Sequence, residues 1–239
     1  MSARHRDPSD GTLGPMPVPL TISIIAAVTV ALVWWWLVPR IPEPDAEELA
    51  ASTTDGEPPK RLYRTLATPT STLLVVTAAA ITTAAVVWVT PPGTWPLWVT
   101  LTTAGLVLAA IDARTTWIPL QTTHIGWTAM GVAVLVSWWV GGWHVAAAAL
   151  LGAALSMAVW WLVWFLSRGG FGFGDVRMAP LVGAPTMATS STCFMWALLV
   201  GSLITLAWAV LDRTFTRRPR MIPWAPGYLA GAVVAGALA

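Results

Sequence analysis

Long apolar stretches separated by short polar segments dominate this chain. Most of them approach the roughly 20 residues that an α-helix needs to cross the hydrocarbon core of a bilayer. The segments between them are rich in proline, glycine or arginine, which favour turns and loops over continued helix. The pattern predicts an all-α, polytopic transmembrane helical bundle of about eight spans, at residues 17–39, 70–90, 95–111, 120–140, 144–166, 176–190, 193–211 and 222–239.

The composition supports a membrane-embedded chain. Hydrophobic residues make up 56% of the sequence and charged residues only 10%, whereas soluble domains carry roughly 25% charged residues. We therefore expect the lipid bilayer to surround most of the chain. The formal net charge of +2 and the lack of a basic tract interleaved with aromatics argue against a nucleic-acid partner. A single cysteine, Cys193, and three scattered histidines indicate no disulfide, no metal site and no cofactor.

Basic residues are distributed unevenly between the predicted loops. All but Arg4 and Arg6 of the 13 Lys and Arg residues fall in every second loop. Because positively charged loops stay on the cytoplasmic side of a membrane, we expect that side to be cytoplasmic. Arg4 and Arg6 lie on the opposite side in this arrangement, so the orientation of the first span is the least constrained.

Two regions differ in character. Residues 1–69 hold a polar tail, a first span that resembles an uncleaved anchor, and a polar loop whose acidic part covers 41–57. Residues 70–239 contain the remaining spans, and we expect this membrane domain to carry the chemistry.

Acidic residues are scarce after Glu57, where only Asp112, Asp175 and Asp212 occur. A carboxylate at membrane depth costs about 2.5–3.5 kcal/mol on insertion scales, which makes each one a candidate functional residue. Two complete predicted spans separate Asp112 from Asp175, so both should reach the same side at similar depth. Asp212 adjoins Arg213 and precedes three more arginines, so we expect a surface ion pair there.

Two aspartates that approach each other cannot comfortably both ionise, and they share a proton. One carboxylate can then remove a proton from water while the other carboxyl group polarises a peptide carbonyl. Gly172 and Gly174 would let an extended peptide approach the second acid. Other interpretations remain open: Asp175 as a helix N-cap, Asp112 as a partner of Arg114, and the glycines as a flexible loop.

Three short blocks occur in a fixed order over residues 105–239. They are Ile111-Asp112 followed by Ile118-Pro119, Gly172-Phe173-Gly174-Asp175-Val176-Arg177, and Ile222-Pro223-Trp224-Ala225-Pro226. This arrangement resembles the type IV prepilin leader peptidases, which are bacterial intramembrane aspartyl proteases with a Gly-x-Gly-Asp motif. The resemblance implies the corresponding protease-like fold.

The resemblance also implies residue roles. Asp112 and Asp175 would be the catalytic pair, and Gly172 and Gly174 would shape the loop of the second aspartate. Residues that belong to the same blocks would bind substrate or shape loops, namely Pro119, Arg177 and Pro223. The implied partners are pilin-like precursors with a short basic leader, cut at the cytoplasmic face of the bacterial plasma membrane.

Several positions depart from the family pattern. Leu120 stands where the family has Asp or Asn, Arg177 replaces Lys, and Trp224-Ala225 replaces Phe-Gly. Larger members also methylate the new N-terminus and carry a zinc-binding domain with four cysteines after the first span. The corresponding loop, 40–68, contains no cysteine, so we predict peptidase activity alone.

Two other functions fit parts of the sequence. A catalytically silent membrane scaffold would keep the fold without turnover, as the Leu120 departure would allow. A small transporter could use the acids as a proton relay, which requires them at different depths. The sequence alone identifies neither a particular pilin-like substrate nor an oligomeric state.

Overall fold

The computed structural model describes residues 17–45, 61–168, 172–216 and 222–239, and within these ranges the chain is helical without any strand. The helices follow the predicted apolar stretches closely. Their bounds are α1 Val18–Leu32, η1 Val33–Leu37, η2 Val38–Arg40, η3 Tyr63–Thr65, α3 Pro69–Val87, η4 Pro92–Thr94, α4 Trp95–Thr100, η5 Leu101–Gly105, α5 Leu106–Thr115, α6 Leu120–Gly141, α7 Trp143–Leu166, α8 Phe173–Thr189, α9 Ser191–Thr216 and α10 Ala225–Ala237.

Within the described ranges, six helical segments are long and apolar enough to cross a membrane, so the chain is a multi-pass membrane protein. These segments are Val18–Arg40, Pro69–Val87, Pro92–Thr115, Leu120–Gly141, Trp143–Leu166 and Ser191–Phe215.

The remaining two predicted spans, 176–190 and 222–239, correspond to the shorter helices α8 and α10. Helix α10 has 13 residues, which at 1.5 Å per residue extend over about 20 Å, less than the thickness of the hydrocarbon core. Helix α8 has 17 residues and contains Pro180 and Pro185. A count of eight spans is therefore not confirmed by these lengths.

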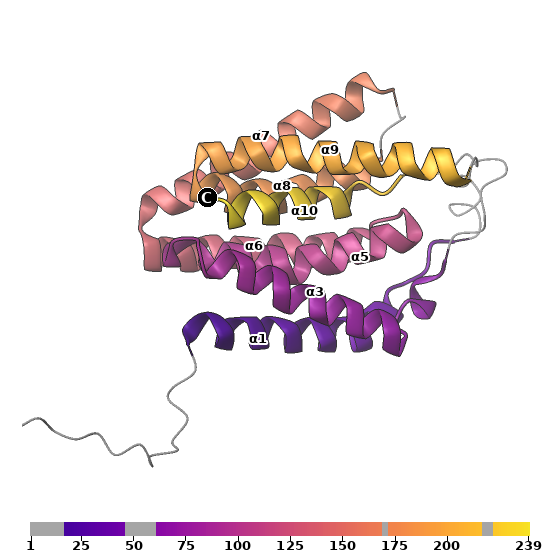
Figure 1. Ribbon diagram of the computed structural model, residues 1–239, viewed down its shortest axis with the longest axis horizontal. Helices are drawn as coiled ribbons and strands as arrows, with labels where there is room; N and C mark the ends of the chain where they lie inside the picture. Colours follow the sequence, from indigo (N-terminus) through magenta and orange to yellow (C-terminus); the bar gives the residue numbers. More distant parts are fainter. Residues whose placement is uncertain (1–16, 46–60, 169–171, 217–221) are drawn as a thin grey trace, which may run out of the picture.

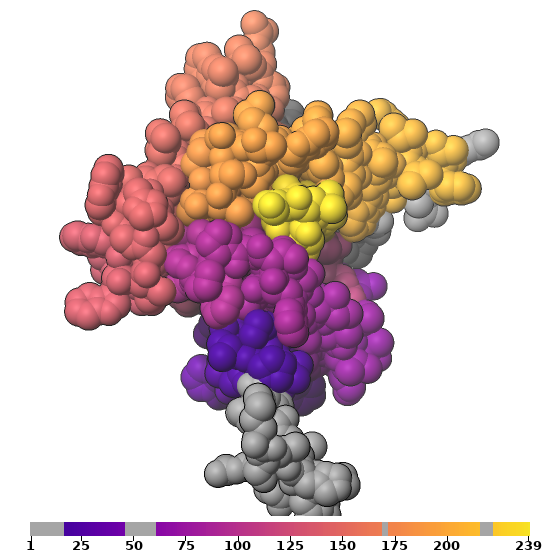
Figure 2. All heavy atoms as spheres, turned by 60° about the vertical axis from the view of Figure 1, so that its left-hand side comes forward, coloured from indigo at the N-terminus to yellow at the C-terminus, as the bar shows by residue number. Residues whose placement is uncertain are grey.

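The helices lie roughly side by side in successive layers (Figure 1). Helices α1 and α3 form one side, α5 and α6 follow, and α8 and α10 lie between these and α7 and α9. Figure 2 shows the end of α10, in yellow, between α9 and α3. One hydrophobic core extends from Val30 to Ala235, which places the two short helices inside the bundle.

Small residues allow the two short helices to pack closely on their neighbours. A Cβ atom at Gly183 of α8 would overlap the carbonyl of Gly152 on α7, and one at Gly231 of α10 would overlap the backbone at Gly201 of α9. Close approach through small residues is typical of helix packing in membranes, where it maximises van der Waals contact. The outer helices instead expose large apolar side chains, such as Trp139 at 92%, to the lipid.

One end of the bundle contains every described arginine. Helices α1, α5, α7 and α9 end there, and α3, α6, α8 and α10 begin there (Figure 1). The arginines in these ends and their adjoining loops are Arg40, Arg61, Arg64, Arg114, Arg168, Arg177 and Arg213. The tail arginines Arg4 and Arg6, and the acidic loop 41–57 from residue 46 onward, lie outside the described residues.

Candidate active site

Asp112 lies in the last turn of α5, at the arginine-bearing end of the bundle. Its side chain is only 5% exposed. The helix ends at Thr116, whose left-handed conformation (φ 54°) turns the chain, and the Thr116 N–H donates to the Asp112 carbonyl oxygen at 2.8 Å. A carboxylate in this position faces the negative end of its own helix dipole, so it needs donors from elsewhere.

The N-terminus of α10 supplies such a donor. The backbone N–H of Ala225 donates to Oδ2 of Asp112 at 3.1 Å. The preceding residue, Trp224, occupies the N-cap position without a side-chain cap, so Asp112 takes over the role that an N-cap side chain normally has. The positive end of the α10 dipole therefore faces the Asp112 carboxylate.

Asp175 lies in the first turn of α8 and is 7% exposed. It is the third residue of the helix, and Gly172 is the N-cap. Asp175 is therefore not the N-cap, the alternative that the preceding glycine favoured. Its Oδ1 atom makes no hydrogen bond to any residue that the structure describes.

The structure brings the two aspartates together. The carboxyl group of Asp112 acts electrostatically on that of Asp175, although 63 residues separate them in sequence. Ile118 lies beside the start of α8, because a Cβ atom at Gly174 would be 3.3 Å from the Ile118 Cβ. The Trp127 indole N–H donates to the Arg177 carbonyl at 2.9 Å and fastens α6 to α8.

The two glycines of the second block leave space for neighbouring side chains. Neither has a positive φ. A Cβ atom at Gly172 would be 3.2 Å from Oδ2 of Asp175, closer than nearly all real contacts of this kind. Gly172 thus leaves room for the carboxyl group, and Gly174 leaves room for Ile118.

The other candidate residues lie at the same end of the bundle. Pro119 is buried at the N-cap of α6, and Pro223 is buried in the segment before α10. The Arg177 guanidinium lies over the Phe173 ring, 5.0 Å from its centroid. Asp212 is partly exposed near the end of α9 and next to Arg213.

An aromatic cluster next to the aspartates has no role in the sequence-based predictions. Tyr228 of α10 is 1% exposed, and its ring packs edge-on against Trp160 of α7 with centroids 4.4 Å apart. The ring of Trp224 also packs against that of Trp160, with centroids 5.7 Å apart. The only sequence signal is the rarity of tyrosine, because Tyr228 is one of two tyrosines in the chain.

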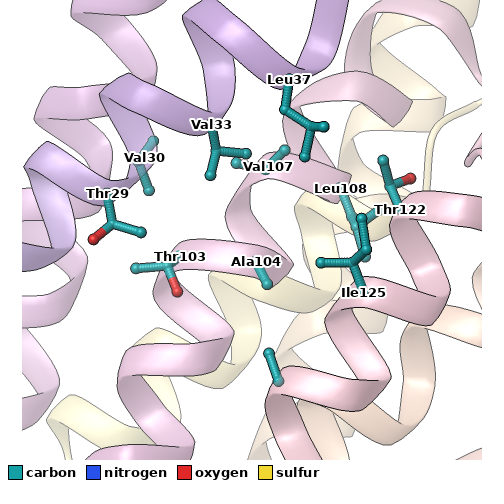
Figure 3. Close-up of a pocket in the computed structure, with 11 residues that line it drawn as sticks. Thr29, Val30, Val33, Leu37, Thr103, Ala104, Val107, Leu108, Thr122 and Ile125 are labelled. Carbon is teal, nitrogen blue, oxygen red and sulfur yellow. The ribbon is translucent and has the colours of Figure 1, made fainter. Parts of the chain in front are cut away.

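Two cavities lie away from the acids. One, of about 190 Å³, is an apolar groove between α1, η5, α5 and α6, with Val33, Ala104 and Ile125 among its lining residues (Figure 3). A second, of about 390 Å³, lies between α9 and α10 near the C-terminus. Neither is lined by Asp112 or Asp175. Among the described residues, no three His, Cys, Asp or Glu side chains gather in a way that could hold a metal ion.

Comparisons with protein families, curated proteins and solved structures find no match for this chain. Fold and site together define a multi-pass membrane protein with a buried pair of aspartates at the end of the bundle that carries the described arginines.

Proposed function

We propose that this chain is an intramembrane aspartyl endopeptidase that removes the short leader from type IV prepilin-like precursors at the cytoplasmic membrane face. One observation supports it above all others: Asp112 and Asp175 are both buried at one end of the bundle, and the charge of one acts on the other. A buried pair of interacting carboxyl groups is the arrangement that shares a proton and activates water.

The two aspartates differ in their hydrogen bonding, and this difference suggests different roles for them. The Ala225 N–H bonded to Asp112 stabilises the ionised carboxylate. Asp175, with Oδ1 lacking a protein partner among the described residues, is the better candidate for the protonated member. Asp112 is then the general base and Asp175 the general acid.

Hydrolysis proceeds in two steps without a metal or cofactor. In the first, a water oxygen bonds to the peptide carbonyl carbon, the water gives a proton to Asp112, and the carbonyl oxygen takes the proton of Asp175. In the second, Asp112 passes its proton to the peptide nitrogen, the C–N bond breaks, and one hydroxyl of the intermediate returns its proton to Asp175. The products are a new carboxyl group and a new amine.

The surroundings of the acids fit a peptide substrate. The concentration of arginines favours the cytoplasmic side for this end of the bundle, and a precursor with a cytoplasmic leader would present its cleavage site there. Gly172 and Gly174 leave bare backbone beside Asp175, which an extended peptide segment could join by main-chain hydrogen bonds. The bacterial plasma membrane is the location that this substrate class requires.

Methyl transfer is not part of the proposal. The loop between the first two spans contains no cysteine, and the single cysteine of the chain, Cys193, is buried in α9. The four cysteines that bind zinc in the bifunctional family members therefore have no counterpart in this loop.

One observation favours a second candidate function, a catalytically silent scaffold. Asp112 caps α10, and this structural role alone could explain a buried carboxylate at that position. The proton-relay transporter is less favoured, because both acids lie at the same end of the bundle.

Co-expression of the chain with a pilin precursor distinguishes these functions. Asp112→Asn and Asp175→Asn should each abolish leader removal, because an amide can neither accept the proton of water nor donate one from an acid. Asp212→Asn serves as the control and should leave processing intact. Normal processing by both the Asp112 and Asp175 variants would exclude the protease.

A further inference from the structure

Tyr228 is a buried polar residue that takes part in no step of the two-aspartate mechanism described above. It lies on α10 three residues after Ala225, so its side chain projects from the helix face that contacts Asp112. Only 1% of its surface is exposed, and the T-shaped contact with Trp160 fixes the plane of its ring.

The Tyr228 hydroxyl lacks a hydrogen-bond partner within the described part of the chain. Buried hydroxyl groups in proteins are nearly always hydrogen-bonded, because an unsatisfied one loses its bonds to water without replacement. A phenylalanine would fill the same space without that penalty. The hydroxyl is therefore poorly explained by packing alone.

The unpaired hydroxyl lies beside the catalytic acids. The Asp175 carboxyl group is close enough to interact with it electrostatically, and the Ser202 hydroxyl of α9 also interacts with it but does not meet the geometric criteria of a hydrogen bond. Among the described residues, Oδ1 of Asp175 also has no hydrogen-bond partner. The Tyr228 O–H and the Oδ1 atom of Asp175 thus both lack a well-formed hydrogen bond to the described residues, at one end of the bundle. A substrate carbonyl oxygen that accepts from both would satisfy them.

We propose that the Tyr228 hydroxyl donates a hydrogen bond to the carbonyl oxygen of the scissile peptide bond, next to Asp175. The bond strengthens as the oxygen gains negative charge on the way to the tetrahedral intermediate, so it lowers the barrier more than it tightens substrate binding. No proton leaves the tyrosine. The inference rests on the proposed peptidase function.

The first test is Tyr228→Phe in the purified full-length chain, with a pilin precursor as substrate. Loss of one donor of this kind lowers kcat by about 10²–10³, and we expect a fall of at least about tenfold with KM within about twofold. Tyr63→Phe is the matched control. It removes the other tyrosine hydroxyl, also from a buried side chain, in η3, and should leave both constants unchanged.

The kinetic outcomes separate this inference from the proposed function. If Asp112→Asn and Asp175→Asn are inactive while Tyr228→Phe keeps the wild-type kcat, the role of Tyr228 is wrong and the peptidase stands. A change in KM alone also overturns the role. If both aspartate variants cleave normally, the peptidase itself fails, and the role of Tyr228 with it.

A second measurement does not depend on the folding of Tyr228→Phe. In the Tyr63→Phe background position 228 is the only tyrosine, so 3-fluorotyrosine labels it alone. With Asp112→Asn added to prevent cleavage, the fluorine resonance should shift when precursor peptide binds, because the hydroxyl gains a partner. An unchanged resonance at saturating peptide overturns the inference.

Discussion

The backbone N–H of Ala225 and the side chain of Asp112 join two helices that are 113 residues apart in sequence, by a hydrogen bond of 3.1 Å. The bond places the positive end of α10 against the negative end of α5, which offsets the unfavourable position of a carboxylate at a helix C-terminus. Asp112 thus caps α10 and, in the proposed mechanism, also accepts the proton of water. Variants that differ only in hydrogen-bonding capacity can separate these two roles.

Asp112→Asn and Asp112→Ala should therefore behave differently. The amide oxygen of asparagine still accepts the Ala225 N–H, so we expect a thermal midpoint close to that of the wild type and no peptidase activity. Alanine removes the acceptor, and loss of a cap costs about 0.5–2 kcal/mol of folding free energy. Thermal unfolding in detergent measures the difference. Equal midpoints for the two variants would contradict the capping role.

Asp175→Asn should leave the fold at least as stable as the wild type. Its carboxyl group is buried, with Oδ1 unsatisfied by the described residues, and burial of an acid without partners is unfavourable. An asparagine amide has nearly the same size and cannot ionise, so it avoids any cost of a charge at this buried position. We expect an unchanged or higher thermal midpoint together with loss of cleavage. A clear fall in stability would show that Asp175 has a structural role instead.

Gly172→Ala should lower kcat with little effect on stability. The new methyl group would lie 3.2 Å from Oδ2 of Asp175, so the carboxyl group must shift by a few tenths of an ångström. Misplacement of a catalytic group by about 1 Å can reduce the rate about 10²-fold, and we expect a loss of roughly tenfold for this smaller shift. Steady-state cleavage kinetics measure it.

Gly131→Ala is the control for this glycine variant. A Cβ atom at Gly131, on the exposed side of α6, meets nothing within 4 Å. Alanine there should raise stability by about 0.5–1 kcal/mol, because glycine weakens a helix interior, and the cleavage rate should not change. Equal rates for the Gly172 and Gly131 variants would contradict the crowding argument.

Gly183→Ala tests the packing that holds α8 inside the bundle. The added methyl group would overlap the Gly152 carbonyl of α7, and overpacking of this kind costs about 1–3 kcal/mol. We expect a lower thermal midpoint than that of Gly131→Ala. A midpoint equal to the wild type would show that α7 and α8 do not pack as closely as the structure has them.

The sequence predicts the long helices well, because apolar length is a direct requirement of the bilayer. It predicts less about α8 and α10. The apolar runs of these two helices have no clear boundary in the sequence. The structure shows that α8 begins at Phe173 and that both helices are packed between other helices. Asp175 is therefore the third residue of α8 and not its N-cap, which was one of the interpretations that the sequence left open.

The candidate site, like the fold, is predictable from the sequence only in part. Two intervening spans suffice to place Asp112 and Asp175 at one end of the bundle. The Ala225 hydrogen bond and the unpaired Tyr228 hydroxyl depend on the path of the chain through all the helices between them, which no local pattern encodes. Tyrosine in an apolar helix is also a common packing residue, so its position alone does not indicate chemistry.

The most direct test of the central claim is cleavage of a purified pilin precursor by the purified chain, with the products identified by mass spectrometry. The account predicts one cut in the wild-type reaction, which releases the basic leader and leaves the apolar segment with a new N-terminus. It predicts intact precursor with Asp112→Asn and with Asp175→Asn. Cleavage at the wild-type rate by both variants, or no cleavage by the wild-type chain, would contradict it.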